Sequence, residues 1–322
     1  MATHYAYSGP IDCTQEPNVN NVKDKMVIVT GGSHGIGAVY ARTLVQAGAY
    51  VMIGDLDTKS GEALAGTLQE GWDEQVKLFD EAISRSPTGR VDAVVVNAGI
   101  ATTDGIFADD CKTSLHQELR ALRKELTIFI WPAEQDYPTK PSVRILDVNL
   151  IGGMYTIKLA LYHFRRQYRR DLAAGKEASD TSLIIQSSMA GYLDMPGSLL
   201  YAASKFGLRA AMASLRHTTP QHRTRVNLIA PWFINTGMIP EHFMDLIASK
   251  GIAWASVQDA AGALIAIIAN PLVNGRSFAV VPRKWAPRGY LDIDQDDLKE
   301  GDRLGEWQGL LLSLGDELAN LN

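Results

Sequence analysis

Two residues capable of acid–base chemistry, Tyr201 and Lys205, stand four positions apart in the stretch LLYAASKFGL, residues 199–208. The stretch contains helix-forming residues and no proline, so we expect a helix on which the two side chains are neighbours. A tyrosine hydroxyl has an ordinary pKa of about 10, which is too high for a base near neutral pH. A nearby ammonium group favours the phenolate, and such a pair can take a proton from an alcohol. A solvent-exposed surface pair is the alternative interpretation of this spacing.

A glycine-rich segment, TGGSHGIG at residues 30–37, lies between a run of β-branched residues and an apolar segment with helical periodicity. Glycines at a strand-to-helix turn let the backbone approach a diphosphate, and the helix N-terminus supplies N–H groups. The spacing differs from the usual G-x-G-x-x-G dinucleotide fingerprint. Asp55 follows 18 residues after Gly37, near the position where an acidic residue accepts ribose hydroxyl groups. The sequence therefore predicts a nucleotide site, with an ordinary glycine turn and strand-end aspartate as the alternative.

Short apolar runs rich in β-branched residues alternate with helical patterns along the chain. This alternation predicts βαβ units and therefore an α/β fold. The expected architecture is a Rossmann-type, doubly wound parallel sheet with helices on both faces, in three α/β/α layers. The segment 145–170 reads as one long helix, in which RRQYRR at 165–170 is interpreted as a solvated helix end. The predicted strands are residues 26–32, 50–57, 91–100, 181–189, 225–231 and 277–282.

Several motifs, taken in chain order, resemble those of the short-chain dehydrogenase/reductase family: TGGSHGIG, NAG at 97–99, Asn149, Ser188, YAASK at 201–205 and RVNLIAP at 225–231. The resemblance spans residues 24–283 and is nearest to the branch of NAD-dependent 15-hydroxyprostaglandin dehydrogenase and its fungal relatives. It implies an oxidoreductase that interconverts a secondary alcohol and a ketone. In this family pattern Tyr201 is the acid/base, Lys205 lowers its pKa, Ser188 rather than Ser187 orients the substrate oxygen, and Asn149 continues the proton relay.

The resemblance also implies NAD as the cofactor. Ile234 and Thr236 match positions that hold the nicotinamide carboxamide, whereas Trp232 replaces a glycine of the family pattern. A carboxylate at Asp55 disfavours the 2′-phosphate of NADP, and His34 stands where NADP-preferring members carry Arg or Lys. The complete predicted cofactor set is Gly31, Ser33, Gly35, Ile36, Gly37, Asp55, Asn97, Ala98, Gly99, Tyr201, Lys205, Pro231, Ile234 and Thr236.

The sequence departs from the family after the second predicted strand. Helical patterns follow one another through LAGTLQEGWDEQVKLFDEAISR, and the family's third strand, with the aspartate that lies beside the adenine, is missing. We therefore expect the second strand at a sheet edge and an open adenine pocket. Residues 101–144 form an insertion with a helix expected near 114–126. The predicted organisation is a polar arm at 1–23, a catalytic domain at 24–285 and an extension at 286–322 containing a surface helix at 306–314.

Composition narrows the function classes. The 322 residues carry a net charge of −5 without a long basic run, which argues against nucleic acid as a partner. The two cysteines form neither a disulfide framework nor a metal pattern, and no apolar run has the roughly 18 residues of a membrane span. We expect a cytoplasmic protein without a metal or membrane site.

The family resemblance implies a homodimer or homotetramer that pairs through the long helix and the Tyr–Lys helix. The substrate is expected to be an apolar alcohol or ketone, because residues 237–258, at the family's lid position, are rich in Met, Phe, Ile and Trp. A non-catalytic dinucleotide-binding protein, and an isomerase or dehydratase that uses the same four residues, are alternative functions.

Overall fold

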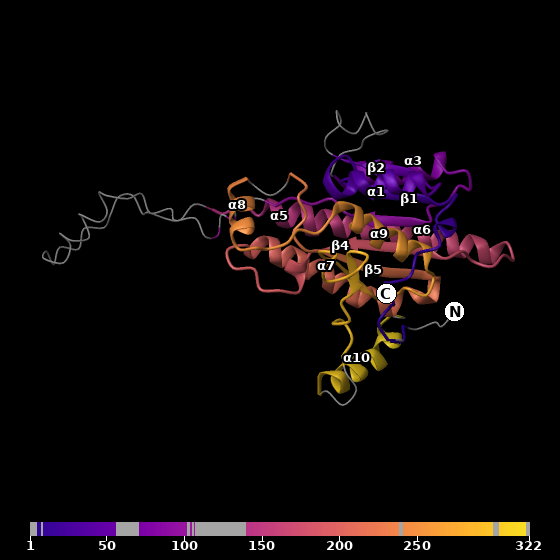
Figure 1. Ribbon diagram of the computed structural model, residues 1–322. Helices are drawn as coiled ribbons and strands as arrows, with labels where there is room; N and C mark the ends of the chain where they lie inside the picture. The colour runs from indigo at the N-terminus through magenta and orange to yellow at the C-terminus, as the bar shows by residue number, and fades with distance from the viewer. Residues whose placement is uncertain are drawn as a thin grey trace, which may run out of the picture.

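A seven-stranded sheet with helices on both faces forms the core of the protein (Figure 1). The computed structural model describes residues 5–7, 9–55, 71–101, 104, 106, 140–237, 241–298 and 303–319. The strand order is β2-β1-β3-β4-β5-β6-β7, and every pairing is parallel except that of β7 with β6. The strands are β1 (Met26–Thr30), β2 (Tyr50–Gly54), β3 (Ala93–Val96), β4 (Thr181–Gln186), β5 (Thr224–Pro231), β6 (Ser277–Val280) and β7 (Tyr290–Asp292).

Alternate strand residues supply two separate apolar cores, one on each face of the sheet. Val29 and Ile229 belong to the core covered by α1 (Gly35–Gln46) and α9 (Val257–Ala269). Ile28 and Leu228 belong to the opposite core, which is covered by α3 (Trp72–Arg85), α6 (Gly153–Ala173) and α7 (Leu199–Thr218). The α/β prediction is therefore confirmed. The helices on both faces hold the parallel strands so that their carboxyl ends lie at the same edge of the sheet.

The helix expected at 145–170 is continuous from Arg144 to Ala173 but contains a widened turn. It begins as α5 (Arg144–Leu146), passes through the π-helical segment η3 (Asp147–Gly152) and continues as α6. This helix has the length and composition of a membrane span, a criterion that core helices of soluble proteins also meet. Its buried residues, including Phe164, pack into the core of the α3/α6/α7 face.

The second strand lies at the edge of the described sheet, as expected. β2 pairs with β1, and the described residues between β2 and β3 contain the single helix α3 and no strand. Residues 56–70, where the family has further elements, lie outside the described part, as does most of the 101–144 insertion, including the helix expected near 114–126.

The last strand, β7, was not predicted. Arg276, next to β6, holds the segment that begins with β7, because its guanidinium contacts the carboxylates of Asp292, Asp294 and Asp297 at 2.7, 2.6 and 2.9 Å. The N-terminal arm joins the same cluster, since the Tyr5 hydroxyl donates to Asp297 at 2.8 Å. The N-terminal arm and the segment Asp292–Asp297 are therefore tied to the same edge of the sheet.

Three short 3-10 turns and two further helices complete the described elements. The turns are η1 (Val19–Asn21), η4 (Met189–Gly191) and η5 (Pro220–His222), and α8 (Glu241–Ser249) lies in the predicted lid region. The C-terminal helix α10 (Arg303–Ala319) is longer than the predicted 306–314. It projects away from the sheet rather than lying on it (Figure 1).

Candidate active site

Tyr201 and Lys205 lie one turn apart at the start of α7, as their spacing predicts. The Lys205 side chain is buried, its ammonium nitrogen lies 5.5 Å from the centroid of the Tyr201 ring, and it donates a hydrogen bond of 3.3 Å to the Gln186 carbonyl oxygen. Burial lowers the pKa of Lys205 from 10.5 to about 8. Tyr201 is half-buried, so the pair is not a fully solvated surface pair.

Burial acts in the opposite direction on the tyrosine. Desolvation raises the pKa of Tyr201 above its ordinary 10.0, and a hydrogen bond with the Ser188 side chain lowers it in part. Ser188 follows β4, caps η4 by accepting a hydrogen bond of 3.1 Å from the Ala190 N–H, and reaches the Pro231 carbonyl oxygen at 3.5 Å. The structure thus brings Ser188 to Tyr201.

Ser187 points elsewhere, as strand alternation predicts. Its hydroxyl donates to the Lys205 carbonyl oxygen at 3.0 Å, and a Cβ on Gly191 would come within 2.8 Å of that hydroxyl. Ser187 therefore fixes the backbone of α7 beside β4, while the adjacent Ser188 lies at the tyrosine.

Asn149 occupies the π-helical segment η3 and is completely buried. Its carboxamide oxygen accepts a 2.7 Å hydrogen bond from the Ile100 N–H, and its nitrogen donates to the Ile100 carbonyl at 3.0 Å and to the Ser204 hydroxyl at 3.2 Å. A Cβ on Gly99 would lie 3.2 Å from the Asn149 carboxamide oxygen and 3.6 Å from the Lys205 ammonium nitrogen. Gly99, which has no side chain, therefore leaves room between the Asn149 carboxamide and the Lys205 ammonium group. The position of Asn149 in a π-helical segment is also notable, because such segments are frequent at functional sites.

The glycine-rich turn has no space for side chains at its key positions. Gly31 has a φ of +65°, and a Cβ there would lie 2.7 Å from the Ala98 Cα. A Cβ on Gly37 would overlap the Gly31 carbonyl oxygen. The turn is clamped by Asn97, whose amide nitrogen donates to the Thr30 and Gly31 carbonyls at 2.9 and 3.0 Å. The predicted residues Gly31, Gly37, Asn97 and Ala98 thus form one close-packed unit.

Ser33 and Asp55 meet at this turn. One Asp55 carboxylate oxygen accepts a 2.8 Å hydrogen bond from the Ser33 N–H. The Ser33 hydroxyl is buried and has no hydrogen-bond partner among the described residues. A buried hydroxyl without a partner costs free energy, so this group is well suited to bind a polar ligand. Helix α1 begins two residues later, and its N-cap, His34, makes no side-chain capping bond.

The segment after β5 reaches back to the same turn. A Cβ on Gly35 would lie 3.2 Å from the Thr236 Cβ, so Thr236 stands directly against the turn. Ile234 is buried and bridges Ala255. Of the predicted residues after β5, Thr236 therefore lies at the glycine turn, against Gly35. Pro231 ends β5, where it pairs with Val280.

Trp232, at the position of the family glycine, begins an aromatic cluster. Its indole nitrogen donates to the Ala253 carbonyl at 3.2 Å, and its ring contacts those of Phe233 and Trp285 with centroid distances of 4.9 and 5.7 Å. Phe233 in turn contacts Trp254, with the ring centroids 6.3 Å apart. The cluster joins the end of β5 to the predicted lid region and to the β6–β7 connection.

Two polar residues at the site were absent from the predicted set. The Thr30 hydroxyl accepts hydrogen bonds from the N–H groups of Asn97 and Ala98 at 3.1 and 3.2 Å and so ties β1 to β3. Gln186 accepts from Lys205 through its carbonyl and from the Tyr40 hydroxyl, at 2.7 Å, through its side chain. Thr30 is the first residue of the TGGSHGIG motif, so the sequence could have identified it. Gln186 contacts Lys205 through its backbone carbonyl, and such a contact cannot be predicted from the residue type.

The turn, the unpartnered Ser33 hydroxyl and the Tyr201–Lys205 pair fit a nicotinamide dinucleotide. Gly31 and Gly37 permit close backbone approach, and the start of α1 offers N–H groups to a diphosphate. The described residues contain no group of three or more His, Cys, Asp or Glu side chains arranged to hold a metal ion.

The sequence matches the short chain dehydrogenase family over residues 25–122 and 132–246. A 5′-hydroxyaverantin dehydrogenase from Dothistroma septosporum is 32% identical over 303 residues, which are 87% of this chain and 90% of that protein. The corresponding protein of Emericella nidulans is 30% identical over 311 residues, 91% of this chain and 93% of that protein. Another fungal relative, from Phoma sp., is named an NADP-dependent dehydrogenase and is 27% identical over 292 residues, 85% of this chain and 79% of its own.

The fold has solved counterparts. The crystal structure of a 3-ketoacyl-(acyl-carrier-protein) reductase from Brucella melitensis complexed with NADH matches with a TM-score of 0.60 and 20% sequence identity. The match covers 80% of this chain and 97% of that chain.

Proposed function

The chain belongs to the short-chain dehydrogenase family, and on this premise we propose that it interconverts a secondary alcohol and a ketone, with NAD as the hydride carrier. The observation that carries the proposal is the arrangement of the buried Lys205 with the half-buried Tyr201 and Ser188, in which Lys205 lies beside the Tyr201 ring and Ser188 is hydrogen-bonded with Tyr201. Bound NAD would supply the hydride acceptor or donor, and the residues of the chain would bind, orient and exchange the proton.

Tyr201 is the proposed acid/base. Removal of hydride from a carbinol carbon requires that its hydroxyl lose a proton, and the Tyr201 oxygen would take it. With a pKa of about 8, the Lys205 amine remains mostly protonated at pH 7 and favours the phenolate electrostatically. Ser188, hydrogen-bonded with Tyr201, would orient the substrate oxygen. Asn149 is a positioning residue, because its side chain holds the Ile100 backbone and Ser204 beside this pair.

Asp55 supports the choice of NAD over NADP. Its carboxylate lies against the glycine turn, where it would accept ribose hydroxyls and repel a 2′-phosphate. Two of the relatives are named NADP-dependent dehydrogenases, whereas the solved reductase of the same fold is complexed with NADH. The selectivity therefore rests on the position of Asp55 and needs a direct test.

The substrate is proposed to be an apolar molecule with ring surfaces. Trp232, Phe233, Trp254 and Trp285 form a continuous aromatic cluster from the end of β5, and the Trp285 side chain is 52% exposed. Aromatic faces bind apolar and aromatic molecules through their large contact area. Two relatives are named 5′-hydroxyaverantin dehydrogenases, and a hydroxyl-bearing compound in that name is consistent with an alcohol substrate.

A two-part experiment tests the proposal. Calorimetric titration with NAD measures cofactor binding, and NADH absorbance at 340 nm, read over a panel of apolar secondary alcohols and the matching ketones, measures turnover. We expect both binding and turnover. Binding without turnover of any alcohol or ketone would favour a non-catalytic dinucleotide-binding protein, and the absence of binding would overturn the cofactor assignment.

A further inference from the structure

The segment that follows β7 contacts the loop that carries Ser188. This loop, residues 188–192, consists of Ser188, the turn η4 and Tyr192. The Tyr192 hydroxyl donates a hydrogen bond of 2.8 Å to one carboxylate oxygen of Asp296. Burial and, after it, the charge of Asp296 raise the pKa of Tyr192 above its ordinary 10.0, so the hydroxyl stays protonated and remains a donor near neutral pH. A residue far along the chain is therefore bonded directly to the loop.

Arg209 of α7 links Asp296 to the same loop a second time. Its Nε atom donates to the other Asp296 oxygen at 2.7 Å, and a terminal nitrogen donates to the Gly191 carbonyl oxygen at 3.3 Å. The guanidinium also lies over the Tyr192 ring, 3.9 Å from the ring centroid. The Asp296 side chain is only 6% exposed, so solvent ions screen these contacts little.

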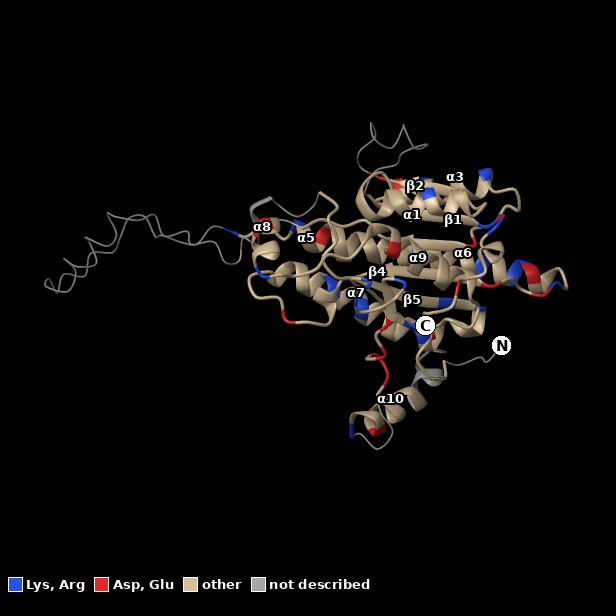
Figure 2. Ribbon diagram, viewed as in Figure 1, with Lys and Arg blue, Asp and Glu red and all other residues tan. Residues whose placement is uncertain are grey.

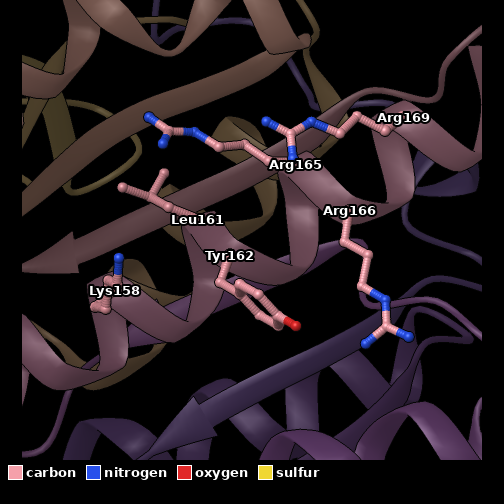
Figure 3. Close-up of a pocket in the computed structure, with 6 residues that line it drawn as sticks. All are labelled: Lys158, Leu161, Tyr162, Arg165, Arg166 and Arg169. Atoms are coloured by element: carbon pink, nitrogen blue, oxygen red, sulfur yellow. The ribbon is translucent and has the colours of Figure 1, made fainter. Parts of the chain in front are cut away.

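Arginines without a carboxylate partner are arranged differently in this protein. Arg165, Arg166 and Arg169 of α6 line a hollow of about 420 Å³ (Figure 3), and among the described residues they form no ion pair with an acidic side chain. An arginine side chain has many rotamers, and a carboxylate within bonding distance selects one of them. The Asp296 carboxylate therefore keeps Arg209 against the loop.

Asp296 is itself held firmly. Its carbonyl oxygen accepts a 2.7 Å hydrogen bond from Arg216, and the neighbouring carboxylates of Asp294 and Asp297 pair with Arg276. Figure 2 shows acidic residues on this segment, between the sheet and α10. A side chain can position another group only when its own support is rigid. The segment lies beyond residue 246, where the match to the family ends.

The loop sets the position of Ser188 through short hydrogen bonds. The Ser188 hydroxyl accepts from the Ala190 N–H at 3.1 Å, and the Ser188 carbonyl oxygen accepts from the Gly191 N–H at 2.9 Å. A Cβ on Gly191 would lie 3.0 Å from the Lys205 carbonyl oxygen, so the turn already lies against the backbone of α7. A shift of Gly191 or of the adjoining Tyr192 would therefore move the Ser188 hydroxyl.

We propose that Asp296 is a positioning residue for Ser188. By holding Tyr192 and Arg209 it fixes the loop, and the loop directs the Ser188 hydroxyl towards the substrate oxygen. The inference rests on the proposed oxidoreductase function, in which Ser188 orients that oxygen. Misplacing an orienting group by about 1 Å can lower a rate about a hundredfold. Loss of the Asp296 carboxylate should therefore reduce turnover, although this group takes no part in the proton transfer.

Three full-length variants test the role of Asp296. Asp296→Ala removes both links to the loop, whereas Tyr192→Phe removes the hydroxyl contact alone and keeps the ring beneath Arg209. The matched control is Asp297→Ala, which removes the neighbouring carboxylate. That carboxylate pairs with Arg276 and makes no hydrogen bond to the loop within the described residues. Urea unfolding checks that each variant is folded.

Turnover and loop exchange are measured for each protein. The kcat of alcohol oxidation is compared with the NAD dissociation constant, and hydrogen–deuterium exchange with mass spectrometry follows the amides of residues 188–192. We expect Asp296→Ala to lower kcat about ten- to a hundredfold while the NAD dissociation constant changes less than about threefold. Tyr192→Phe should give a smaller loss, and both variants should speed exchange in the loop. Asp297→Ala should lower stability but leave kcat and loop exchange near their wild-type values.

Wild-type loop exchange in Asp296→Ala would overturn the proposal. An equal loss of kcat in Asp296→Ala and Asp297→Ala would also overturn it, because the loss would then reflect general destabilisation. A wild type that binds NAD but turns over no alcohol or ketone would refute the proposed function instead. Loop exchange, which needs no substrate, then decides by itself whether Asp296 holds the loop.

Discussion

The Lys205 ammonium nitrogen lies 5.5 Å from the centroid of the Tyr201 ring at the start of α7, where Lys205 is buried and Tyr201 is half-buried. Enclosure raises the pKa of the tyrosine and lowers that of the lysine, so it favours the neutral form of each. The positive charge that remains on Lys205 near neutral pH favours the phenolate. The proposed chemistry depends on this balance, and the pH dependence of the protein follows from it.

Replacing Lys205 by methionine should stabilise the fold at neutral pH. The pKa of Lys205 is lowered from 10.5 to about 8, so below pH 8 the folded protein holds a buried charge that the unfolded chain exposes to water. The loss of folding free energy caused by burying this charge is complete below about pH 8 and disappears as the pH rises towards 10.5. Urea unfolding should show Lys205→Met to be more stable by up to about 3 kcal/mol at pH 7, with the difference shrinking by pH 10. A variant less stable than wild type at pH 7 would show that the lysine is not buried as a destabilising charge.

Alcohol oxidation should accelerate as the pH rises. The proposed proton acceptor is the Tyr201 phenolate, and burial raises the pKa of that hydroxyl above 10.0. The base is therefore mostly protonated near pH 7, and its active fraction grows with pH. Ketone reduction needs the protonated form and should be flat over the same range. Initial rates in both directions between pH 6 and 10 check this, and an oxidation rate that falls steadily above pH 7 would be inconsistent with Tyr201 as the base.

Adding one methyl group at Gly37 should damage the cofactor turn. A Cβ there would overlap the Gly31 carbonyl oxygen and come within 2.5 Å of the Asn97 amide nitrogen, so the clamp has to move. Gly37→Ala should therefore lower the free energy of unfolding by about 1–3 kcal/mol and weaken NAD binding. Gly309→Ala is the matched control, because nothing lies within 4 Å of its Cβ and alanine favours a helix. Equal effects of the two substitutions would mean that the turn is not close-packed.

Asp55 should determine the preference for NAD over NADP. Two unit charges about 4 Å apart near a protein surface interact by roughly 4 kcal/mol at an effective dielectric of 20, and water and counterions reduce this value. We expect wild type to bind NAD about ten- to a thousandfold more tightly than NADP. Asp55→Asn should remove most of this preference while keeping an acceptor for the Ser33 N–H, whereas Asp55→Ala should also loosen the turn. Calorimetry that shows tighter binding of NADP to wild type would refute the role of Asp55.

The sequence pattern predicted the sheet well where strands are buried on both faces. The runs at 26–32 and 225–231 are continuous and β-branched, and they form β1 and β5 with small shifts at their ends. β7 escaped prediction because it has three residues and is held by Arg276, whose contacts with Asp292, Asp294 and Asp297 are long-range. Local periodicity carries no information about such contacts.

The candidate site residues were named from the sequence, but their contacts were only partly predictable. Strand alternation separated Ser188 from Ser187, and the structure places their hydroxyls at Tyr201 and at the Lys205 carbonyl, respectively. The buried hydrogen bonds of Asn149 depend on a π segment that residue types do not reveal. Similarly, the sequence indicated a helix at the C-terminus, but its projection away from the sheet could be learned only from the fold (Figure 1).

The most direct test of the account is the turnover of Tyr201→Phe, which removes one oxygen and keeps the ring beside Lys205. Once the alcohol screen has supplied a substrate, kcat and the NAD dissociation constant are measured for wild type and variant under the same conditions. We predict that kcat falls to background while the NAD dissociation constant changes less than about threefold, because the hydroxyl acts on the transition state. A variant that retains more than about a tenth of the wild-type kcat, a barrier change below about 1.4 kcal/mol, would contradict the assignment of Tyr201 as the acid/base.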